Sequence, residues 1–128
     1  MGAGKRTILV AEDDLAIRQT LVEVLRHEGY VVAEAASGNA ALCILKSLTV
    51  DLVISDIQME NGDGFFLLQE INKIGTEAPP LLFISAHTEI SVKDVQSRGA
   101  RALVRKPIDI KELLDQILSL IGRVAQSP

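Results

Sequence analysis

Short apolar runs alternate with longer amphipathic segments along this sequence, and the alternation constrains the fold more than any other feature. The runs consist largely of consecutive apolar residues, without the regular polar interruptions of a half-exposed strand. Such runs are typical of strands in parallel sheets, because these strands are covered on both faces. The expected strands are 8–11, 30–35, 52–55, 81–85 and 102–104.

Between these runs, apolar residues recur every three or four positions, as they do on one face of a helix. Ser37 and Asp109 stand where the second and last helices begin, and both are typical N-cap residues. Gly29 and Gly99 are expected to end the first and fourth helices, the fourth being a short segment over 89–98. The apolar faces of the first, second, third and last helices are expected to comprise Ile17, Leu21, Val24 and Leu25; Ala41, Leu42, Leu45 and Leu48; Phe65, Leu68 and Ile71; and Leu113, Leu114, Ile117, Leu120 and Ile121.

The order of these segments defines the expected fold class. Strands that alternate with helices form right-handed crossovers and lie parallel to one another. The sequence therefore predicts an α/β protein with a doubly wound, five-stranded parallel sheet and five helices. At 128 residues the chain has the size of one domain, which we expect to span 1–124, with a C-terminal tail over 125–128 that begins a linker.

Charge and cysteine content argue against several classes of function. The 17 acidic and 13 basic side chains give a net charge of −4, without the basic excess that is typical of nucleic-acid binding. No apolar stretch is long enough to cross a bilayer, and the N-terminal residues lack a signal-peptide core. Cys43 is the only cysteine, so no internal disulfide can form. We expect a cytoplasmic protein that binds neither nucleic acid nor membranes directly.

Reactive side chains follow four of the five expected strands. Glu12 and Asp13 follow the first strand, Asp56 follows the third, and Lys106 follows the fifth. The fourth strand ends in Ser85. Because ligands of doubly wound folds bind at the carboxyl ends of the strands, we expect these side chains to gather at one edge of the sheet.

The chemistry of this group favours a magnesium site that handles phosphate. Two like charges about 4 Å apart cost roughly 4 kcal/mol at an effective dielectric constant of about 20, so three carboxylates need a cation between them. Carboxylate oxygens suit Mg²⁺. An aspartate such as Asp56 is a competent nucleophile towards a phosphoryl group, and Ser85 and Lys106 would supply a hydroxyl and a positive charge for the product.

Four segments resemble the sequence signatures of response-regulator receiver domains. They are residues 8–14, 53–56, 84–86 and 105–107, and they occur in the order and spacing of that family. The resemblance implies the flavodoxin-like receiver fold and a phosphoacceptor switch in a two-component phosphorelay. A histidine kinase or histidine phosphotransfer protein would donate the phosphoryl group, and an output domain or effector protein would respond.

The same resemblance implies a role for each site residue. Asp56 would be the phosphoacceptor and would bind Mg²⁺ together with Glu12, Asp13 and the backbone carbonyl of Gln58. Asp13 would contact the ion directly, and Glu12 more often through water.

Two further groups would act on the phosphoryl group itself. Ser85 would swing towards the phosphoryl group, and Lys106 would pair with it. The peptide between Lys106 and Pro107 resembles one that the family often holds in cis. A receiver of this kind is not expected to be an enzyme, since it catalyses at most its own phosphorylation and dephosphorylation.

Three positions depart from the family pattern. Glu60 stands where the family usually has proline, Leu103 replaces a tyrosine or phenylalanine three residues before the lysine, and Ile108 replaces a frequent phenylalanine. Because the missing aromatic normally reports the movement of the hydroxyl, an alternative function is a pseudo-receiver, an interaction module that does not depend on phosphorylation. A Mg²⁺-dependent phosphohydrolase is a weaker alternative, because residues 12–15 lack the spacing of its two aspartates.

Simpler roles are expected for several neighbouring residues. Asp14 is expected to cap the first helix, Asp63 to belong to a turn, and His87 to face solvent in a loop. Three arginines near the fifth strand are expected to form a scattered, solvated edge: Arg98, Arg101 and Arg105.

Overall fold

The computed structural model describes residues 5–122, so the predicted tail over 125–128 lies outside the described residues. One parallel sheet forms the centre of the molecule, with the strand order β2-β1-β3-β4-β5. The strands are β1 (Thr7–Ala11), β2 (Val31–Ala35), β3 (Leu52–Asp56), β4 (Leu81–Ser85) and β5 (Ala102–Arg105). The predicted doubly wound parallel sheet is therefore confirmed.

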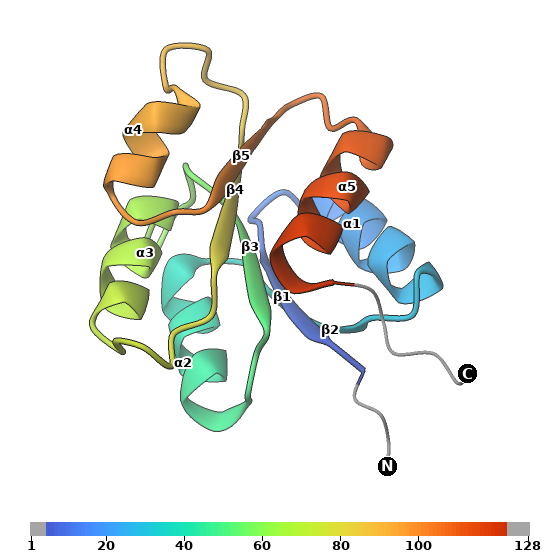
Figure 1. Ribbon diagram of the computed structural model, residues 1–128, viewed down its shortest axis with the longest axis horizontal. Helices are drawn as coiled ribbons and strands as arrows, with labels where there is room; N and C mark the ends of the chain where they lie inside the picture. The colour runs from blue at the N-terminus through green and yellow to red at the C-terminus, as the bar shows by residue number, and fades with distance from the viewer. Residues whose placement is uncertain (1–4, 123–128) are drawn as a thin grey trace.

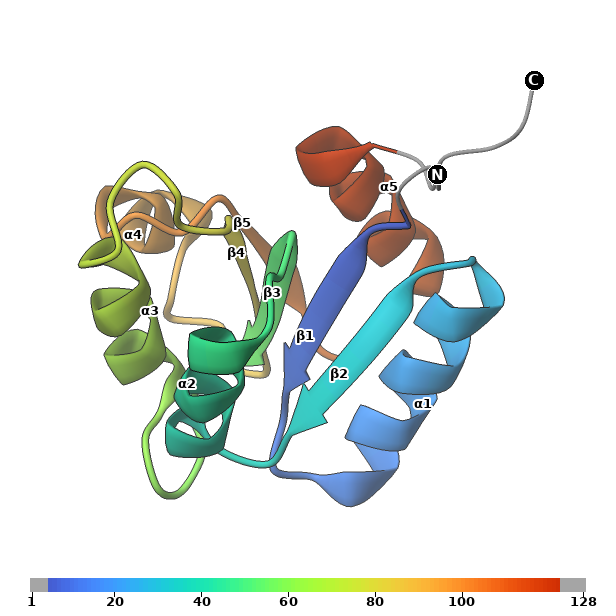
Figure 2. The same ribbon diagram turned by 90° about the horizontal axis from the view of Figure 1, so that it is seen from below.

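Helices cover both faces of this sheet (Figures 1 and 2). Helices α1 (Leu15–His27) and α5 (Ile110–Ile121) pack on one face. Helices α2 (Gly38–Ser47), α3 (Gly64–Asn72) and α4 (Val92–Ser97) pack on the other face. Within the described residues, no helix combines the length and the hydrophobicity that a membrane span requires.

Each central strand contributes to two hydrophobic cores, which explains its unbroken apolar sequence. In β1, Ile8 and Val10 face the core under α1 and α5, whereas Leu9 and Ala11 face the core under α2, α3 and α4. All four side chains are fully buried. A buried Ile, Val or Leu side chain contributes about 1.5–3 kcal/mol, so a polar residue at any of these positions would be costly.

Every helix begins at a side chain that accepts a hydrogen bond from a free backbone amide. Ser37 and Asp109 cap α2 and α5, and Asp14 caps α1, as predicted. Asp63 is more than a turn residue, because its Oδ1 accepts a 2.8 Å hydrogen bond from Phe66 and caps α3. These caps fix the points at which the chain leaves the carboxyl edge of the sheet.

Two details of the helices differ from the sequence expectation. Helix α4 is shorter than the predicted 89–98, because Ser91 forms a capping box with Asp94 and the preceding residues form a loop. Leu48 lies at the C-cap of α2 and is 42% exposed, so it does not belong to the buried helix face.

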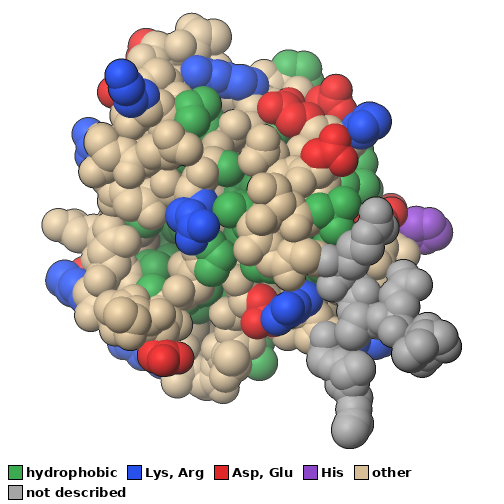
Figure 3. All heavy atoms as spheres, in the orientation of Figure 1, with side chains coloured by type: hydrophobic (Ala, Val, Ile, Leu, Met, Phe, Trp, Pro, Cys, Tyr) green, Lys and Arg blue, Asp and Glu red, His purple; other side chains and the backbone are tan. Residues whose placement is uncertain are grey.

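The strand order creates a switch point between β1 and β3, where ligands of such folds bind. The chain first leaves β1 towards β2 and then returns past β1 to β3. On the face shown in Figure 3, the basic side chains of the described residues lie scattered among acidic ones.

Candidate functional site

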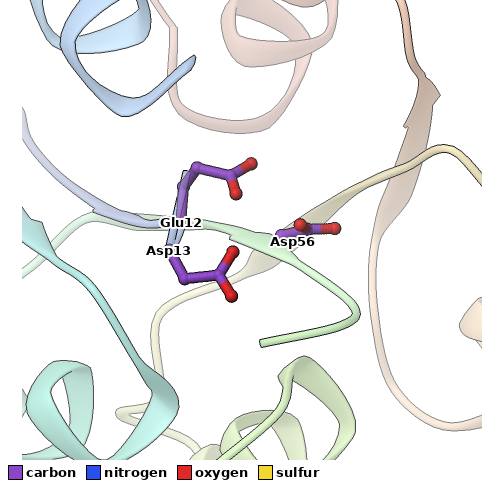
Figure 4. Close-up of side chains that lie close together, drawn as sticks. All are labelled: Glu12, Asp13 and Asp56. Carbon is purple, nitrogen blue, oxygen red and sulfur yellow. The ribbon is translucent and has the colours of Figure 1, made fainter. Parts of the chain in front are cut away.

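Three carboxylates meet at the switch point, at the ends of two adjacent strands. One oxygen each from Glu12, Asp13 and Asp56 lies within 4.8 Å of the others (Figure 4). The register that pairs Ala11 with Ser55 places the next residues of β1 and β3 side by side. The predicted convergence of these acids is therefore found in the structure.

Glu12 is the buried member of this cluster, with no exposed surface. Its Oε2 accepts a 3.1 Å hydrogen bond from the amide of Asp14, and its backbone carbonyl accepts one of 2.8 Å from Arg18. Its Oε1 lies 3.0 Å from Nζ of Lys106 and has no further partner among the described residues. A buried carboxylate oxygen with one partner retains the capacity to accept a further donor or a cation.

Lys106 joins the two strands of the acidic cluster from the end of β5. Its Nζ lies 3.0 Å from Glu12 Oε1 and 3.1 Å from Asp56 Oδ2. Burial raises the pKa of the Glu12 carboxyl above its usual value, although the amide of Asp14 and the ammonium of Lys106 oppose this shift. Burial lowers the pKa of Lys106, but its contacts with Glu12 and Asp56 outweigh burial and leave the pKa above its usual value. Lys106 therefore carries its charge at neutral pH.

The three carboxylates differ in their access to solvent. Asp56 is buried but retains 8% of its surface, whereas Asp13 is exposed. Beside Asp13 lies an open hollow of about 420 Å³, which is also lined by Gln58, Glu60 and Asp63. Asp13 therefore borders an open hollow, whereas Glu12 is fully buried.

Gln58, the predicted source of a carbonyl ligand, is exposed in the loop between β3 and α3. This loop is tied to the start of α2, because the amides of Gly38 and Asn39 donate to the carbonyls of Gly62 and Asn61 at 2.7 and 3.1 Å. A Cβ atom on Gly38 would lie 2.5 Å from the oxygen of Gly62. The sequence analysis missed this contact, although a glycine directly after the Ser37 N-cap was a signal for a close backbone approach.

Ser85 is fully buried at the end of β4, which is adjacent to β3 and its Asp56 and is separated by β3 from the acidic pair after β1. Its Oγ accepts a 2.9 Å hydrogen bond from the amide of His87, and its carbonyl accepts one of 2.8 Å from the amide of Lys106. Among the described residues, Ser85 forms no hydrogen bond with Asp56. The structure thus brings Ser85 to the predicted edge, with its hydroxyl oxygen engaged by the following loop.

The surroundings of Ser85 refine two expectations. His87 lies in a loop as predicted and is half-exposed, its Nδ1 lies 3.2 Å from Oε2 of Glu89, and its carbonyl accepts a hydrogen bond from Arg105. Arg105 is therefore half-exposed and not freely solvated, whereas Arg98 and Arg101 are exposed as predicted, with the guanidinium of Arg98 4.4 Å from the ring centre of Phe65. In contrast, the predicted cis peptide before Pro107 is confirmed.

The donor set fits a hard divalent cation. All three converging ligand atoms are carboxylate oxygens, and a single ammonium group balances only part of their negative charge. Mg²⁺ is bound by one or two protein carboxylates together with waters and phosphate oxygens. This cluster satisfies that requirement with groups from β1 and β3.

A doubly wound sheet that carries an acidic pair, an aspartate and a lysine at its carboxyl edge has the architecture of a receiver domain. The family model described as the response regulator receiver domain matches residues 8–118, and the chain belongs to this family.

Similar proteins occur in different contexts. The transcriptional regulatory protein PdtaR of Mycobacterium tuberculosis is 34% identical over 120 residues, which are 92% of this chain and 58% of PdtaR. The sensor kinase CckA of Brucella abortus is 33% identical over 124 residues, which are 94% of this chain and 13% of CckA. The chain thus spans little more than half of one relative and a small part of the other.

A solved structure supports the same assignment. The chemotaxis protein CheY4 of Vibrio cholerae superimposes with a TM-score of 0.82 at 26% identity, covering 91% of this chain and 99% of CheY4. The receiver fold predicted from the sequence is therefore confirmed by a similar domain that spans the whole of another protein chain.

Proposed function

We propose that this domain is a Mg²⁺-dependent phosphoacceptor switch in a two-component phosphorelay, with Asp56 as the acceptor. The observation that carries this proposal is the contact between Asp56 and Lys106 within the acidic cluster of Glu12 and Asp13. A histidine kinase or a histidine phosphotransfer protein would be the donor.

The proposed transfer moves one phosphoryl group between two side chains. An oxygen of Asp56 attacks the phosphorus, the phosphorus–nitrogen bond to the donor histidine breaks, and the imidazole leaves with the bonding electrons and takes a proton from water. Lys106, which already lies 3.1 Å from Oδ2, would hold the oxygens of the transferred group. Attack by water would later release phosphate and restore the carboxylate.

Glu12, Asp13, Asp56 and the carbonyl of Gln58 would hold the Mg²⁺ ion. When bound, the ion would supply positive charge against the repulsion among these carboxylates and the phosphoryl oxygens. The open hollow beside Asp13 supports this assignment, because metal-bound waters and a phosphate need space on that side.

The domain acts as a signalling module in this proposal and not as an enzyme for an external substrate. It would catalyse its own phosphorylation and dephosphorylation in the cytoplasm, and an output domain or effector protein would recognise the phosphorylated state. The relatives support this reading, because one is named a transcriptional regulatory protein and another a sensor kinase.

Intact-mass measurement tests the assignment directly. The protein is incubated with acetyl phosphate and Mg²⁺, and we expect a single phosphoryl adduct. The adduct should not form when EDTA is present from the start, nor in Asp56→Asn. Asp115→Asn serves as the matched control, because Asp115 is an exposed aspartate of α5 that pairs with Lys111. An adduct that persists in Asp56→Asn would contradict the proposal.

A phosphorylation-independent interaction module is the second candidate. It is favoured by Leu103, which is buried in β5 where the family usually has an aromatic ring that reports on the site. Equal binding of a partner protein by the wild type and by Asp56→Ala would support this candidate over the switch.

A further inference from the structure

A short chain of hydrogen bonds connects the site with the outer strand β5. The amide of His87 donates to Ser85 Oγ at 2.9 Å, and the carbonyl of the same histidine accepts a hydrogen bond from Nη1 of Arg105. Ser85 and Arg105 are also register partners in β4 and β5. His87 is therefore held on its two sides, by the proposed phosphoryl-binding hydroxyl and by a guanidinium group.

We propose that Arg105 is a positioning residue that holds the β4–α4 loop in its unphosphorylated arrangement and is released when Ser85 turns towards the phosphoryl group. This inference rests on the proposed function of Asp56. Once the Ser85 hydroxyl moves, the amide of His87 loses its acceptor. The loop then shifts, the His87 carbonyl turns away, and Arg105 becomes free to bind elsewhere.

The surroundings of β5 support Arg105 as the responding group. Leu103 is apolar and 6% exposed, so it can form no hydrogen bond that would report a moving hydroxyl. Arg98 lies against Phe65, and Arg101 is exposed directly before β5. Among the arginines of this region, within the described residues, only Arg105 is hydrogen-bonded to the loop.

Near His87 the loop has few other restraints, which allows a single hydrogen bond to matter there, whereas Ile90 at the far end of the loop packs against the hydrophobic core. His87 Nδ1 lies 3.2 Å from Glu89, whose side chain is 72% exposed. An exposed contact of this kind contributes little, so it cannot hold the loop alone. A hydrogen bond from a charged guanidinium to a carbonyl is stronger than a neutral one, and Arg105 is therefore the main restraint on the His87 carbonyl.

The chemistry of the released group indicates the kind of partner surface that would recognise it. A guanidinium binds carboxylates through two parallel hydrogen bonds. The phosphorylated form would therefore offer Arg105 to an acidic group of the effector protein or output domain. In the unphosphorylated form the same donor is occupied by the loop.

Thermodynamic reciprocity gives this proposal a test with a definite sign. If the bond from Arg105 stabilises the unphosphorylated arrangement, removing it must favour the other arrangement and any ligand that selects it. Beryllium fluoride with Mg²⁺ is a suitable probe, because it forms a phosphoryl-like adduct on an aspartate. We expect Arg105→Ala to bind this probe about fivefold more tightly than the wild type. A role in stability alone would weaken binding or leave it unchanged.

Two further variants make the titration specific. Arg105→Lys keeps a cationic donor and should bind the probe with nearly wild-type affinity. Arg101→Ala removes an exposed arginine directly before β5 and should also leave the affinity unchanged. Thermal unfolding of each variant establishes that it is folded. If Arg105→Ala is unstable, the affinity of Arg105→Lys for the probe can still be measured.

Nuclear magnetic resonance follows the release itself. Addition of Mg²⁺ and beryllium fluoride to the wild type should shift the His87 amide and the Nε signal of Arg105, with little change at Arg101. Unchanged Arg105 signals together with clear shifts around Asp56 would overturn the role of Arg105 alone. No shift around Asp56, together with no acetyl phosphate adduct, would overturn the phosphoacceptor assignment and this inference with it.

Discussion

The carboxyl edge of the sheet has two parts that are held in different ways. Glu12, Asp56 and Lys106 are joined by ion pairs of 3.0 and 3.1 Å on three separate strands, with little or no exposed surface on the carboxylates. The β4–α4 loop, in contrast, is held at His87 by single hydrogen bonds and by an exposed pair with Glu89. The sheet thus fixes the proposed reacting groups, whereas the β4–α4 loop is held at His87 by fewer contacts.

This contrast follows from the demands on each part. The reacting groups need a constant geometry, and burial in a low dielectric strengthens the attraction between Lys106 and the two carboxylates. The proposed switch would need two arrangements of similar free energy, which a loop with few restraints at His87 would allow. Substitutions in the cluster of Glu12, Asp56 and Lys106 should therefore affect stability strongly. Substitutions at the β4–α4 loop should instead affect the response to phosphorylation.

The largest effect is expected for Lys106→Ala. Loss of the ammonium leaves the buried Glu12 carboxylate without its ion-pair partner. We expect the free energy of unfolding in urea to fall by about 2–3 kcal/mol, because breaking a fully buried pair costs about 3–5 kcal/mol and Lys106 is partly exposed. Lys111→Ala is the matched control, since Lys111 forms a pair with Asp115 on the exposed surface of α5 and should cost under about 0.5 kcal/mol. Equal losses in the two variants would remove the contrast.

A smaller loss of unfolding free energy is expected for Gly38→Ala. This variant tests whether the contact between Gly38 and Gly62 positions the β3–α3 loop, which carries Gln58. The added Cβ atom would lie 2.5 Å from the Gly62 oxygen, so either α2 or the loop has to shift. We expect a destabilisation of about 1–2 kcal/mol together with weaker Mg²⁺ binding in calorimetric titrations. Lys46→Ala, at an exposed position in the last turn of α2, should leave Mg²⁺ binding unchanged. Normal Mg²⁺ affinity in Gly38→Ala would show that the contact does not position the ligands.

These two variants also mark the limit of prediction from sequence. Lys106 was identifiable because the carboxyl ends of parallel strands share one edge, and the register between β1 and β3 then brings Glu12 to Asp56. The contact of Gly38 with Gly62 was not identifiable, because it depends on how α2 and the loop approach each other in space.

The same limit applies to the responding loop. Arg105 was interpreted as a solvated residue because no local pattern indicates that its guanidinium reaches the carbonyl of His87, 18 residues away in the chain. The length of α4 was overestimated for a similar reason, since the apolar spacing continues past the Ser91 cap into the loop. Periodicity predicts which face is buried, but side-chain to backbone contacts across strands require coordinates.

The pH dependence of stability should also separate the two parts. Burial raises the pKa of Glu12 above its usual value of 4.5, so the folded state binds this proton more tightly than the unfolded chain. The contribution of Glu12 is therefore most favourable at low pH and declines as pH rises from about 4.5 through the folded pKa, by at most about 1.4 kcal/mol per pH unit. Urea unfolding of the wild type minus that of Glu12→Gln, measured between pH 4 and 8, should show this decline. A difference that is independent of pH would contradict the assigned burial.

The smallest effect on overall stability is expected for Ser91→Ala, which removes the capping box of α4 at the end of the β4–α4 loop. Ser91 Oγ accepts a 3.0 Å hydrogen bond from the amide of Asp94, and Asp94 Oδ2 accepts one of 3.0 Å from the amide of Ser91. These hydrogen bonds lower the pKa of Asp94 below its usual value of 3.8. The stabilisation from the Asp94 carboxylate is therefore fully present above about pH 4 and is lost as pH falls through the lowered pKa. At neutral pH, Ser91→Ala should accelerate amide exchange within α4 several-fold, because a six-residue helix depends on its cap.

In the same variant, Mg²⁺ affinity and the rate of phosphorylation by acetyl phosphate should stay at wild-type values, because the acidic cluster and Lys106 are unchanged. A parallel loss of Mg²⁺ affinity would mean that loop and acidic cluster form one cooperative unit, and the division between fixed and responding parts would then be wrong.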